Sequence, residues 1–188
     1  SYNKLMPEEQ NRILTDHISD MLLCPTQTAV DNLKKEGVTS GVVNTGDIMY
    51  DTVLRNIDIA NEKYSNGLWF DEIVRENGEI SKLTENAYYL ATIHRAENTD
   101  NPHKLSNIFK AFSELDKPVL LPLHPRTKKL IENLEVDMKS IIVIKPVGYL
   151  LMLYLTSNAY MVVTDSGGLQ KEAYFLKTPC TTLRDQTE

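Results

Sequence analysis

Short apolar runs alternate along this chain with longer segments in which apolar residues recur every three or four positions. The short runs are continuous and do not alternate with polar residues, which is typical of parallel strands that are buried on both faces. The longer segments have the period of amphipathic helices. The pattern therefore predicts an α/β fold, in which helices cover both faces of a Rossmann-like parallel sheet.

The same pattern gives the order of the expected elements. Strands are expected at residues 21–24, 42–44, 88–93, 119–123, 141–144, 160–163 and 180–183. Helices are expected from 7 to 19, from 25 to a stop at Gly37, from 48 to 60, within 69–74, from 101 to 115, through 130–134, over 150–155, and after the Ser-Gly-Gly turn. In the helix that starts at Ile48, the residues expected to face inward are Ile48, Met49, Val53, Ile57 and Ala60.

Polar clusters directly follow three of the predicted strands. They are His94-Arg95, the expected loop His124-Pro125-Arg126, and Asp165-Ser166-Gly167-Gly168. The first of these belongs to a longer polar segment, 94–98, which we also expect to be a loop. Because ligands of open parallel sheets bind at the carboxyl ends of the strands, we expect the clusters to converge on one crevice.

The segment Thr164–Glu172 leads from a strand to a helix through Ser-Gly-Gly. Glycines let a backbone approach a ligand closely, and the first N–H groups of a helix are free to bind an anion, usually phosphate. Glu172 lies about one and a half turns into the helix, where its carboxylate could accept hydrogen bonds from a ribose diol. The alternative is an ordinary strand–helix turn with glycines for tight packing.

Two histidine loops could carry chemistry. His94 and Arg95 together could neutralise a departing phosphate, with His94 as proton or hydrogen-bond donor, or they could form a solvent-exposed polar loop. His124 with Arg126 is similar, although the proline between them favours a turn. Glu8 and Glu9 suit the positive end of a helix, and at most one can enter a site, because adjacent carboxylates point about 100° apart.

Composition narrows the functional classes. The net charge is −6 and the pI is about 5.3, which argues against a nucleic-acid-binding face. Neither a dinucleotide fingerprint, nor a P-loop, nor a metal-ligand spacing is present, so we expect no metal. Cys24 and Cys180 are expected to be buried free thiols in a reducing compartment. With no transmembrane or signal segment in the sequence, a cytoplasmic protein is expected.

Five segments match one family in order and spacing: Met6–Arg12, Asn44–Asp47, Thr92–Asn98, Thr164–Glu172 and Leu183–Glu188. On these motifs the chain resembles the non-hydrolysing UDP-N-acetylglucosamine 2-epimerases. The resemblance implies a glycosyltransferase-B-type fold with an active site between two Rossmann-like domains. It also implies interconversion of UDP-N-acetylglucosamine and UDP-N-acetylmannosamine through elimination of UDP to 2-acetamidoglucal and re-addition, without nicotinamide or metal.

The resemblance also implies a role for each matching residue. It makes Glu8 an acid/base carboxylate and places His94 near the leaving group. The residues that it places in substrate binding are Arg12, Arg95, Met152 near the uracil, Ser166, Gly167 and Gly168 at the diphosphate, and Glu172 at the ribose. Arg95 and His124 are also placed near the regulatory site at which bacterial members bind a second UDP-N-acetylglucosamine.

The resemblance finally implies how the chain is divided. Residues 1–45 match the end of an N-terminal domain, and residues 46–188 match a UDP-binding C-terminal domain that is incomplete at its C-terminus. Because family members carry further catalytic carboxylates in the N-terminal domain, we expect this polypeptide alone to be inactive or nearly so. A homodimer is expected from similar proteins. The open alternatives are a hydrolysing epimerase, a glycosyltransferase of the same architecture, and an inactive UDP-binding fragment or sensor.

Overall fold

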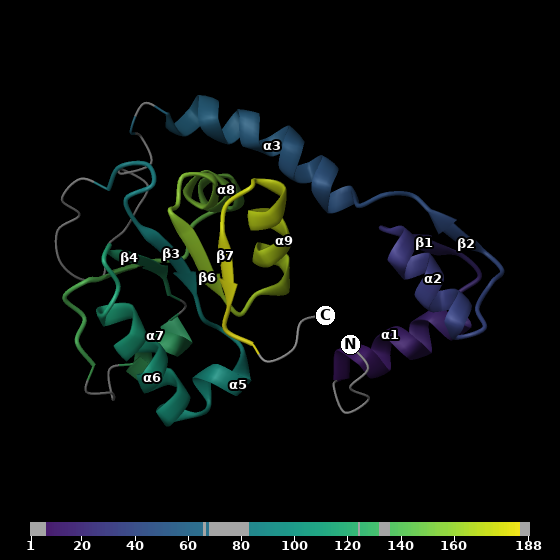
Figure 1. Cartoon of the computed structure of the whole chain (residues 1–188), viewed down its shortest axis with the longest axis horizontal. Helices are drawn as coiled ribbons and strands as arrows, with labels where there is room; N and C mark the ends of the chain where they lie inside the picture. Colours follow the sequence, from purple (N-terminus) through teal and green to yellow (C-terminus); the bar gives the residue numbers. More distant parts are fainter. Residues whose placement is uncertain (1–6, 66, 68–82, 124, 132–135, 185–188) are drawn as a thin grey trace. The chain divides into compact units, whose positions relative to one another are not determined.

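The computed structural model describes residues 7–65, 67, 83–123, 125–131 and 136–184 (Figure 1). Internal packing divides the chain into two compact units, Ser1–Thr52 and Val53–Asp185, and each is described by itself. The division falls within helix α3 (Ile48–Tyr64). The domain boundary predicted between residues 45 and 46 stays a prediction, because a unit of internal packing is not by itself a domain.

The larger unit is built on a five-stranded parallel sheet. The strands lie in the order β5 (Ile141–Ile144), β4 (Val119–Pro122), β3 (Tyr89–Thr92), β6 (Met161–Thr164) and β7 (Cys180–Thr182). In the central register, Leu90 lies beside Leu120 on one side and beside Val162 on the other. The chain therefore adds β4 and β5 on one side of β3 and then returns to add β6 and β7 on the other.

Helices cover both faces of this sheet. Leu90 and Leu120 face a core shared with α3, α8 (Tyr149–Ser157) and α9 (Gly167–Phe175). Their neighbours Tyr89 and Leu121 face the opposite core, shared with α6 (Pro102–Ser113) and α7 (Pro125–Ile131). Figure 1 shows α8 and α9 on one side of the strands and α6 and α7 on the other. The predicted doubly covered parallel sheet is confirmed.

Local sequence explains where several helices begin. In α2 (Gln27–Lys35), the hydroxyl of Thr26 accepts a hydrogen bond from the N–H of Ala29 at 3.2 Å. At the start of α6, the side chain of Asn101 accepts from the N–H of Lys104 at 3.1 Å. Each cap satisfies a backbone donor that has no partner within the helix, which is worth about 1 kcal/mol.

The smaller unit contains α1 (Pro7–Ile18), β1 (Leu22–Cys24), α2 and β2 (Val42–Asn44). β1 and β2 pair in parallel, and their core with α2 is the cluster Leu22, Cys24 and Leu33. On the other face of this pair, Leu23 and Val43 are 63% and 46% exposed. Among the described residues of this unit, one face of the pair is therefore covered and the other is not.

Two segments predicted as loops are helical. After Arg95 the chain forms a single helical turn, α5 (Ala96–Thr99), because the carbonyl of Arg95 accepts the N–H groups of both Asn98 and Thr99. Pro125 opens α7, since proline fits the first position of a helix, where its missing N–H is not needed. His124 and the helix predicted within 69–74 lie outside the described residues.

Two predictions of burial are wrong. Val53 and Ala60 are buried in α3 as expected, but Ile48 is 77% exposed, because it stands at the first residue of the helix, before the turns that reach the core. Cys24 is buried, whereas Cys180 is exposed on β7, the edge strand of the sheet; both are free thiols. Within the described residues, no helix has the length and apolar character needed to span a bilayer.

Candidate functional site

The sheet reverses its order between β3 and β6, and the strongest candidate residues lie at that point. From β3 the chain continues through α5 to α6, which packs on one face, and from β6 it continues to α9 on the other face. Loops that leave neighbouring strands toward opposite faces part at the carboxyl edge and leave a crevice for a ligand. His94 and Arg95 follow β3, while Asp165 and Ser166 follow β6. Two of the three predicted clusters therefore meet.

A buried carboxylate joins these two loops. Asp165 is 0% exposed, and its Oδ2 accepts the N–H groups of Arg95 at 2.9 Å and His94 at 3.0 Å and the amide of Asn98 at 3.1 Å. Its Oδ1 lies 2.9 Å from Nδ1 of His94. In the sequence, Asp165 stood only as one member of the polar cluster that follows the strand at 160–163, with no role of its own.

The imidazole of His94 is held on one side and open on the other. Its side chain is 53% exposed, with Nδ1 on Asp165, and within the described part of the chain no hydrogen bond engages Nε2. A hollow of about 50 Å³ lies beside it, lined also by Ala96, Thr99, Thr127 and Leu130. This hollow has room for water and not for a sugar. It brings α7 next to His94 through Thr127 and Leu130, neither of which belongs to the predicted third cluster.

The Ser-Gly-Gly turn forms an open helix N-terminus. The hydroxyl of Ser166 accepts the N–H of Leu169 at 3.3 Å, and the N–H of Ser166 donates to Thr164 Oγ1 at 2.9 Å. Among the described residues, no intramolecular partner engages the N–H groups of Gly167 and Gly168, the first two residues of α9. A Cβ built on Gly167 would meet nothing within 4 Å. Two backbone donors and the positive end of a nine-residue helix can therefore receive an anion.

Glu172 lies farther along α9, facing α8. It is half-buried, and this burial raises the pKa of its carboxyl group. The pKa of the Tyr149 hydroxyl on α8 is raised, mainly by burial and to a smaller extent by the charge of Glu172. Met152 is half-buried on the same helix and packs against the core. The roles predicted for Glu172 and, from the resemblance, for Met152 stay predictions. Tyr149, at the start of the same helix as Met152, was not singled out in the sequence.

Glu8, Glu9 and Arg12 belong to the smaller unit. Glu9 is 7% exposed, and Nη2 of Arg12 lies 2.9 Å from its carboxylate, which lowers the pKa of Glu9. The same guanidinium pairs with Asp16 at 3.0 Å and Glu36 at 3.2 Å. Glu8 is exposed. Glu9 is thus part of an ion-pair network that joins α1 to the end of α2, and the roles implied for Glu8 and Arg12 stay predictions.

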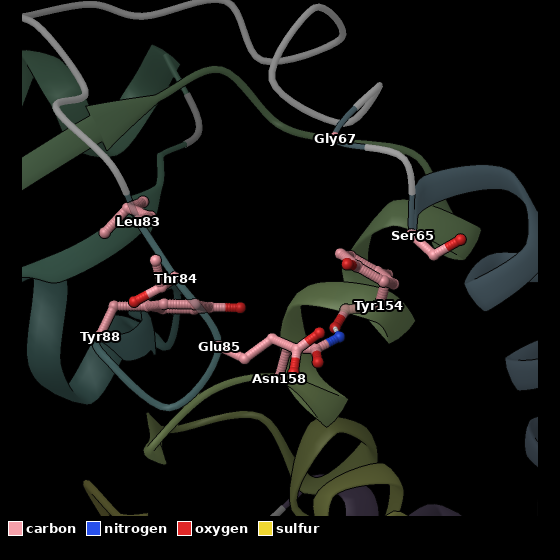
Figure 2. A pocket seen from close by; sticks show the side chains of 8 residues that line it. All are labelled: Ser65, Gly67, Leu83, Thr84, Glu85, Tyr88, Tyr154 and Asn158. Atoms are coloured by element: carbon pink, nitrogen blue, oxygen red, sulfur yellow. Dashed lines mark hydrogen bonds between the residues drawn. The ribbon is translucent and has the colours of Figure 1, made fainter.

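A larger hollow opens at the opposite, amino-terminal edge of the sheet. Its volume is about 380 Å³, and Figure 2 shows Glu85, Tyr88, Tyr154 and Asn158 around it. The described residues that line it include a carboxylate and no cationic side chain. Such a lining opposes a phosphate-bearing ligand. On charge, and despite its size, this hollow is therefore the weaker candidate for a phosphate among the described residues.

The carboxyl edge thus combines an imidazole, two backbone donors at a helix start and a carboxylate on the same helix. These groups can bind a phosphate, transfer a proton at its oxygen and accept hydrogen bonds from hydroxyl groups. Over the described ranges, no three His, Cys, Asp or Glu side chains lie together as metal ligands would.

Comparison with known proteins gives a consistent family. A sequence profile described as UDP-N-acetylglucosamine 2-epimerase matches residues 1–188. A UDP-N-acetylglucosamine 2-epimerase homolog of Methanococcus maripaludis is 48% identical over 193 residues, which cover 100% of this chain and 51% of that protein. A UDP-2,3-diacetamido-2,3-dideoxy-D-glucuronate 2-epimerase of Pseudomonas aeruginosa is 46% identical over 194 residues, covering 100% and 50%. The chain therefore spans about half the length of the curated relatives it matches.

Solved structures agree with the fold. The UDP-GlcNAc 2-epimerase of Methanocaldococcus jannaschii, in complex with UDP-GlcNAc and UDP, matches with a TM-score of 0.82 and 39% identity over 100% of this chain and 51% of that one. The predicted α/β fold of the glycosyltransferase-B type is confirmed.

Proposed function

We propose that this chain, which belongs to the UDP-N-acetylglucosamine 2-epimerase family, supplies the UDP-binding half of a site that interconverts UDP-N-acetylglucosamine and UDP-N-acetylmannosamine. One observation carries the proposal: the His94 loop and the open start of α9 meet where the sheet reverses its order. An imidazole and backbone donors on one edge suit a reaction whose leaving group is a diphosphate.

The diphosphate binds at the start of α9. The N–H groups of Gly167 and Gly168 and the hydroxyl of Ser166 donate to its oxygens. As the bond between C1 and the phosphate oxygen breaks, a carboxylate takes the proton from C2, and the C2–H electron pair becomes the C1–C2 double bond. His94 donates to the departing oxygen. Glu8, whose side chain is exposed, is the proposed carboxylate. Reprotonation on the opposite face and return of UDP complete the exchange.

The nucleoside lies between α8 and α9 in this proposal. The ribose hydroxyls donate to Glu172, whose half-buried carboxylate gains from such donors because burial has removed part of its hydration. Met152 and Tyr149 present apolar surface on α8 for the uracil. Arg12 and Arg95 remain proposed substrate ligands, and Arg95 with His124 the proposed second nucleotide site.

The sugar has a second candidate. The 46% identical relative from Pseudomonas is described as acting on a 2,3-diacetamido glucuronate, and the 48% identical one as an N-acetylglucosamine epimerase homolog. Both sugars carry the acetamido group at C2, the carbon that is epimerised. UDP-2,3-diacetamido-glucuronate is therefore the alternative substrate to assay beside UDP-N-acetylglucosamine.

The deciding experiment uses protein produced from the complete coding sequence, incubated with each UDP sugar in deuterated water. Deuterium at C2 together with both epimers is the expected result. Release of UDP with free N-acetylmannosamine would indicate a hydrolysing enzyme, and transfer of the sugar would indicate a glycosyltransferase. Binding without exchange would indicate a sensor. The 188-residue chain alone is expected to bind UDP and to turn nothing over, because it spans only about half the length of the relatives it matches.

Gly167→Ala tests the diphosphate site directly. The fold has room for the new Cβ, and alanine favours a helix more than glycine, so stability should stay within about 1 kcal/mol of the parent. A phosphate held by the N–H groups of this turn would instead meet the methyl group. UDP affinity, measured by calorimetry at fixed ionic strength, should fall by at least about tenfold, which is about 1.4 kcal/mol. Unchanged UDP affinity in a stable variant would show that the diphosphate does not bind at this turn.

A further inference from the structure

We infer that Asp165, supported by Asn98, is a positioning residue that fixes the tautomer of His94. It thereby makes Nε2 the one ring nitrogen that exchanges a proton with the ligand. The role in the reaction rests on the proposed function. The tautomer itself is a property of the folded chain and can be measured without a substrate.

The hydrogen-bond donors around Asp165 determine this tautomer. The carboxylate is 0% exposed and offers only acceptors, and it already receives the backbone N–H groups of His94 and Arg95. Its Oδ1 lies 2.9 Å from Nδ1 of His94. An unprotonated Nδ1 would place a lone pair against that oxygen, so Nδ1 must carry a hydrogen in the neutral ring as well as in the protonated one. The neutral ring then has its lone pair on Nε2.

Asn98 keeps the carboxylate in place. It is 4% exposed, and its amide nitrogen donates to Oδ2 of Asp165 at 3.1 Å and to the carbonyl of Leu183 at 3.0 Å. Both partners are acceptors, so the amide orientation follows from the network. Since Leu183 directly follows β7, these bonds tie the loops after β3 and β6 to the end of β7. The carboxylate cannot turn away from His94 without leaving buried donors unpaired.

This arrangement has a consequence for proton transfer. When protonated His94 gives its Nε2 proton to the departing phosphate oxygen, the ring becomes neutral with its remaining hydrogen on Nδ1, without any rotation. The same proton returns to Nε2 when UDP is added back. A neutral ring with its hydrogen on Nε2 could donate a hydrogen bond but could not release that proton, because an imidazolate would result.

Asp165→Asn reverses the network with almost no change in volume. The amide oxygen can replace Oδ2 and keep the backbone donors of His94 and Arg95. The amide NH₂ then replaces Oδ1 and donates to Nδ1 of His94, which drives the ring hydrogen to Nε2. Nitrogen-15 NMR of the histidine-labelled 188-residue chain at alkaline pH distinguishes the two forms, and His94→Gln assigns the signals among the four histidines.

We expect the parent chain to show a protonated Nδ1 and a lone pair on Nε2, and Asp165→Asn to show the reverse. In the protein from the complete coding sequence, this variant should lose at least about tenfold in kcat (about 1.4 kcal/mol), while UDP affinity stays within about twofold. Asp137→Asn, an exposed aspartate between α7 and β5, is the matched control and should change neither the tautomer nor kcat.

A parent spectrum with the hydrogen on Nε2, or an Asp165→Asn spectrum like that of the parent, would overturn the inference. The parent spectrum alone decides the tautomer, so the test remains decisive even where Asp165→Asn does not fold. Failure of the two proposals is distinguishable. Absence of C2 exchange in the parent protein overturns the epimerase function and leaves the tautomer standing, whereas the wrong tautomer in a protein that exchanges C2 overturns only this inference.

Discussion

The two compact units follow the same alternation of strand and helix and differ in how much of it is buried. In the larger unit both faces of the five-stranded sheet are covered, and Leu90 and Leu120 are 0% exposed. In the smaller unit β1 and β2 also pair in parallel, yet Leu23 is 63% exposed and Val43 is 46% exposed. Parallel strands are usually buried on both faces. Within the described residues, the sheet of the larger unit has this usual burial and the strand pair of the smaller unit does not.

The difference shows that the same alternation of strand and helix can be stabilised by different interactions. The larger unit is stabilised by two apolar clusters, one on each face of its sheet. The smaller unit has a single small cluster, and its helix α1 is joined to the end of α2 through the ion pairs of Arg12. The proposed UDP site lies in the unit that has the extensive core, where hydrogen bonds between loops can be held to a fixed geometry.

The largest expected effect comes from comparing matched leucines in the two sheets. Leu120→Ala opens a cavity between fully covered strands and should lower the free energy of unfolding of its unit by about 2–5 kcal/mol. Leu23→Ala removes an exposed side chain and should change stability by no more than about 0.5 kcal/mol. Urea unfolding, monitored by hydrogen exchange, assigns each loss in free energy of unfolding to one of the two units. Equal losses would mean that the open face of β1 and β2 is covered in solution.

An intermediate effect is expected from Arg12→Ala, which removes ion pairs only in the smaller unit. Arg12 lowers the pKa of Glu9, chiefly through its hydrogen bond, so this pair stabilises the folded state above the unfolded pKa of Glu9. That contribution disappears as pH falls through the lower folded pKa. The variant should therefore be less stable than the parent at pH 7, and the difference should shrink in acid.

Thermal unfolding at several pH values measures this difference. The control is Arg55→Ala, an exposed arginine of α3, which should lose less. A difference that stays constant from neutral to acidic pH would show that the guanidinium acts by packing and not by its charge.

The smallest expected effect on stability comes from Glu172→Gln in the larger unit. Burial raises the pKa of Glu172, so the folded state binds a proton more tightly than the unfolded chain does. Its contribution therefore favours folding at low pH and is lost as pH rises through the folded pKa. The variant should be slightly more stable than the parent at pH 7 and equal to it in acid.

The same variant should bind UDP roughly tenfold more weakly, about 1.4 kcal/mol, because a neutral amide replaces the charged acceptor for the ribose. Glu114→Gln, at the exposed end of α6, is the control for both measurements. A gain in stability without a loss of UDP affinity would show that Glu172 does not bind the ribose.

The segments with turn chemistry were the most predictable. Thr26, Asn101 and the Ser166 turn begin helices where the sequence placed them, because a cap needs only the residues of one turn. The loops at residues 94–98 and at Pro125 were less predictable. One helical turn after Arg95 and a proline at the first position of α7 look polar and irregular in sequence, although both satisfy helix geometry.

The sequence offered a list of candidate residues, but it did not indicate how the fold holds them in place. Asp165 accepts the N–H of His94 across 71 positions of sequence, and no local pattern indicates which carboxylate will receive distant donors. Glu8 and Glu9 are adjacent and chemically alike, yet one is exposed and the other is paired with Arg12. The helical phase at the start of α1 decides this difference, together with the packing around that turn.

The sequence by itself determined the order of the strands, the parallel α/β class and the helix start at the Ser-Gly-Gly turn, because periodicity and turn chemistry act over a few residues. The tertiary structure decided that β3 and β6 are neighbours, that Asp165 holds His94, and that one sheet is covered on both faces while the other is not. These features depend on which distant strands pair and on which buried donors need an acceptor. Long-range packing sets both.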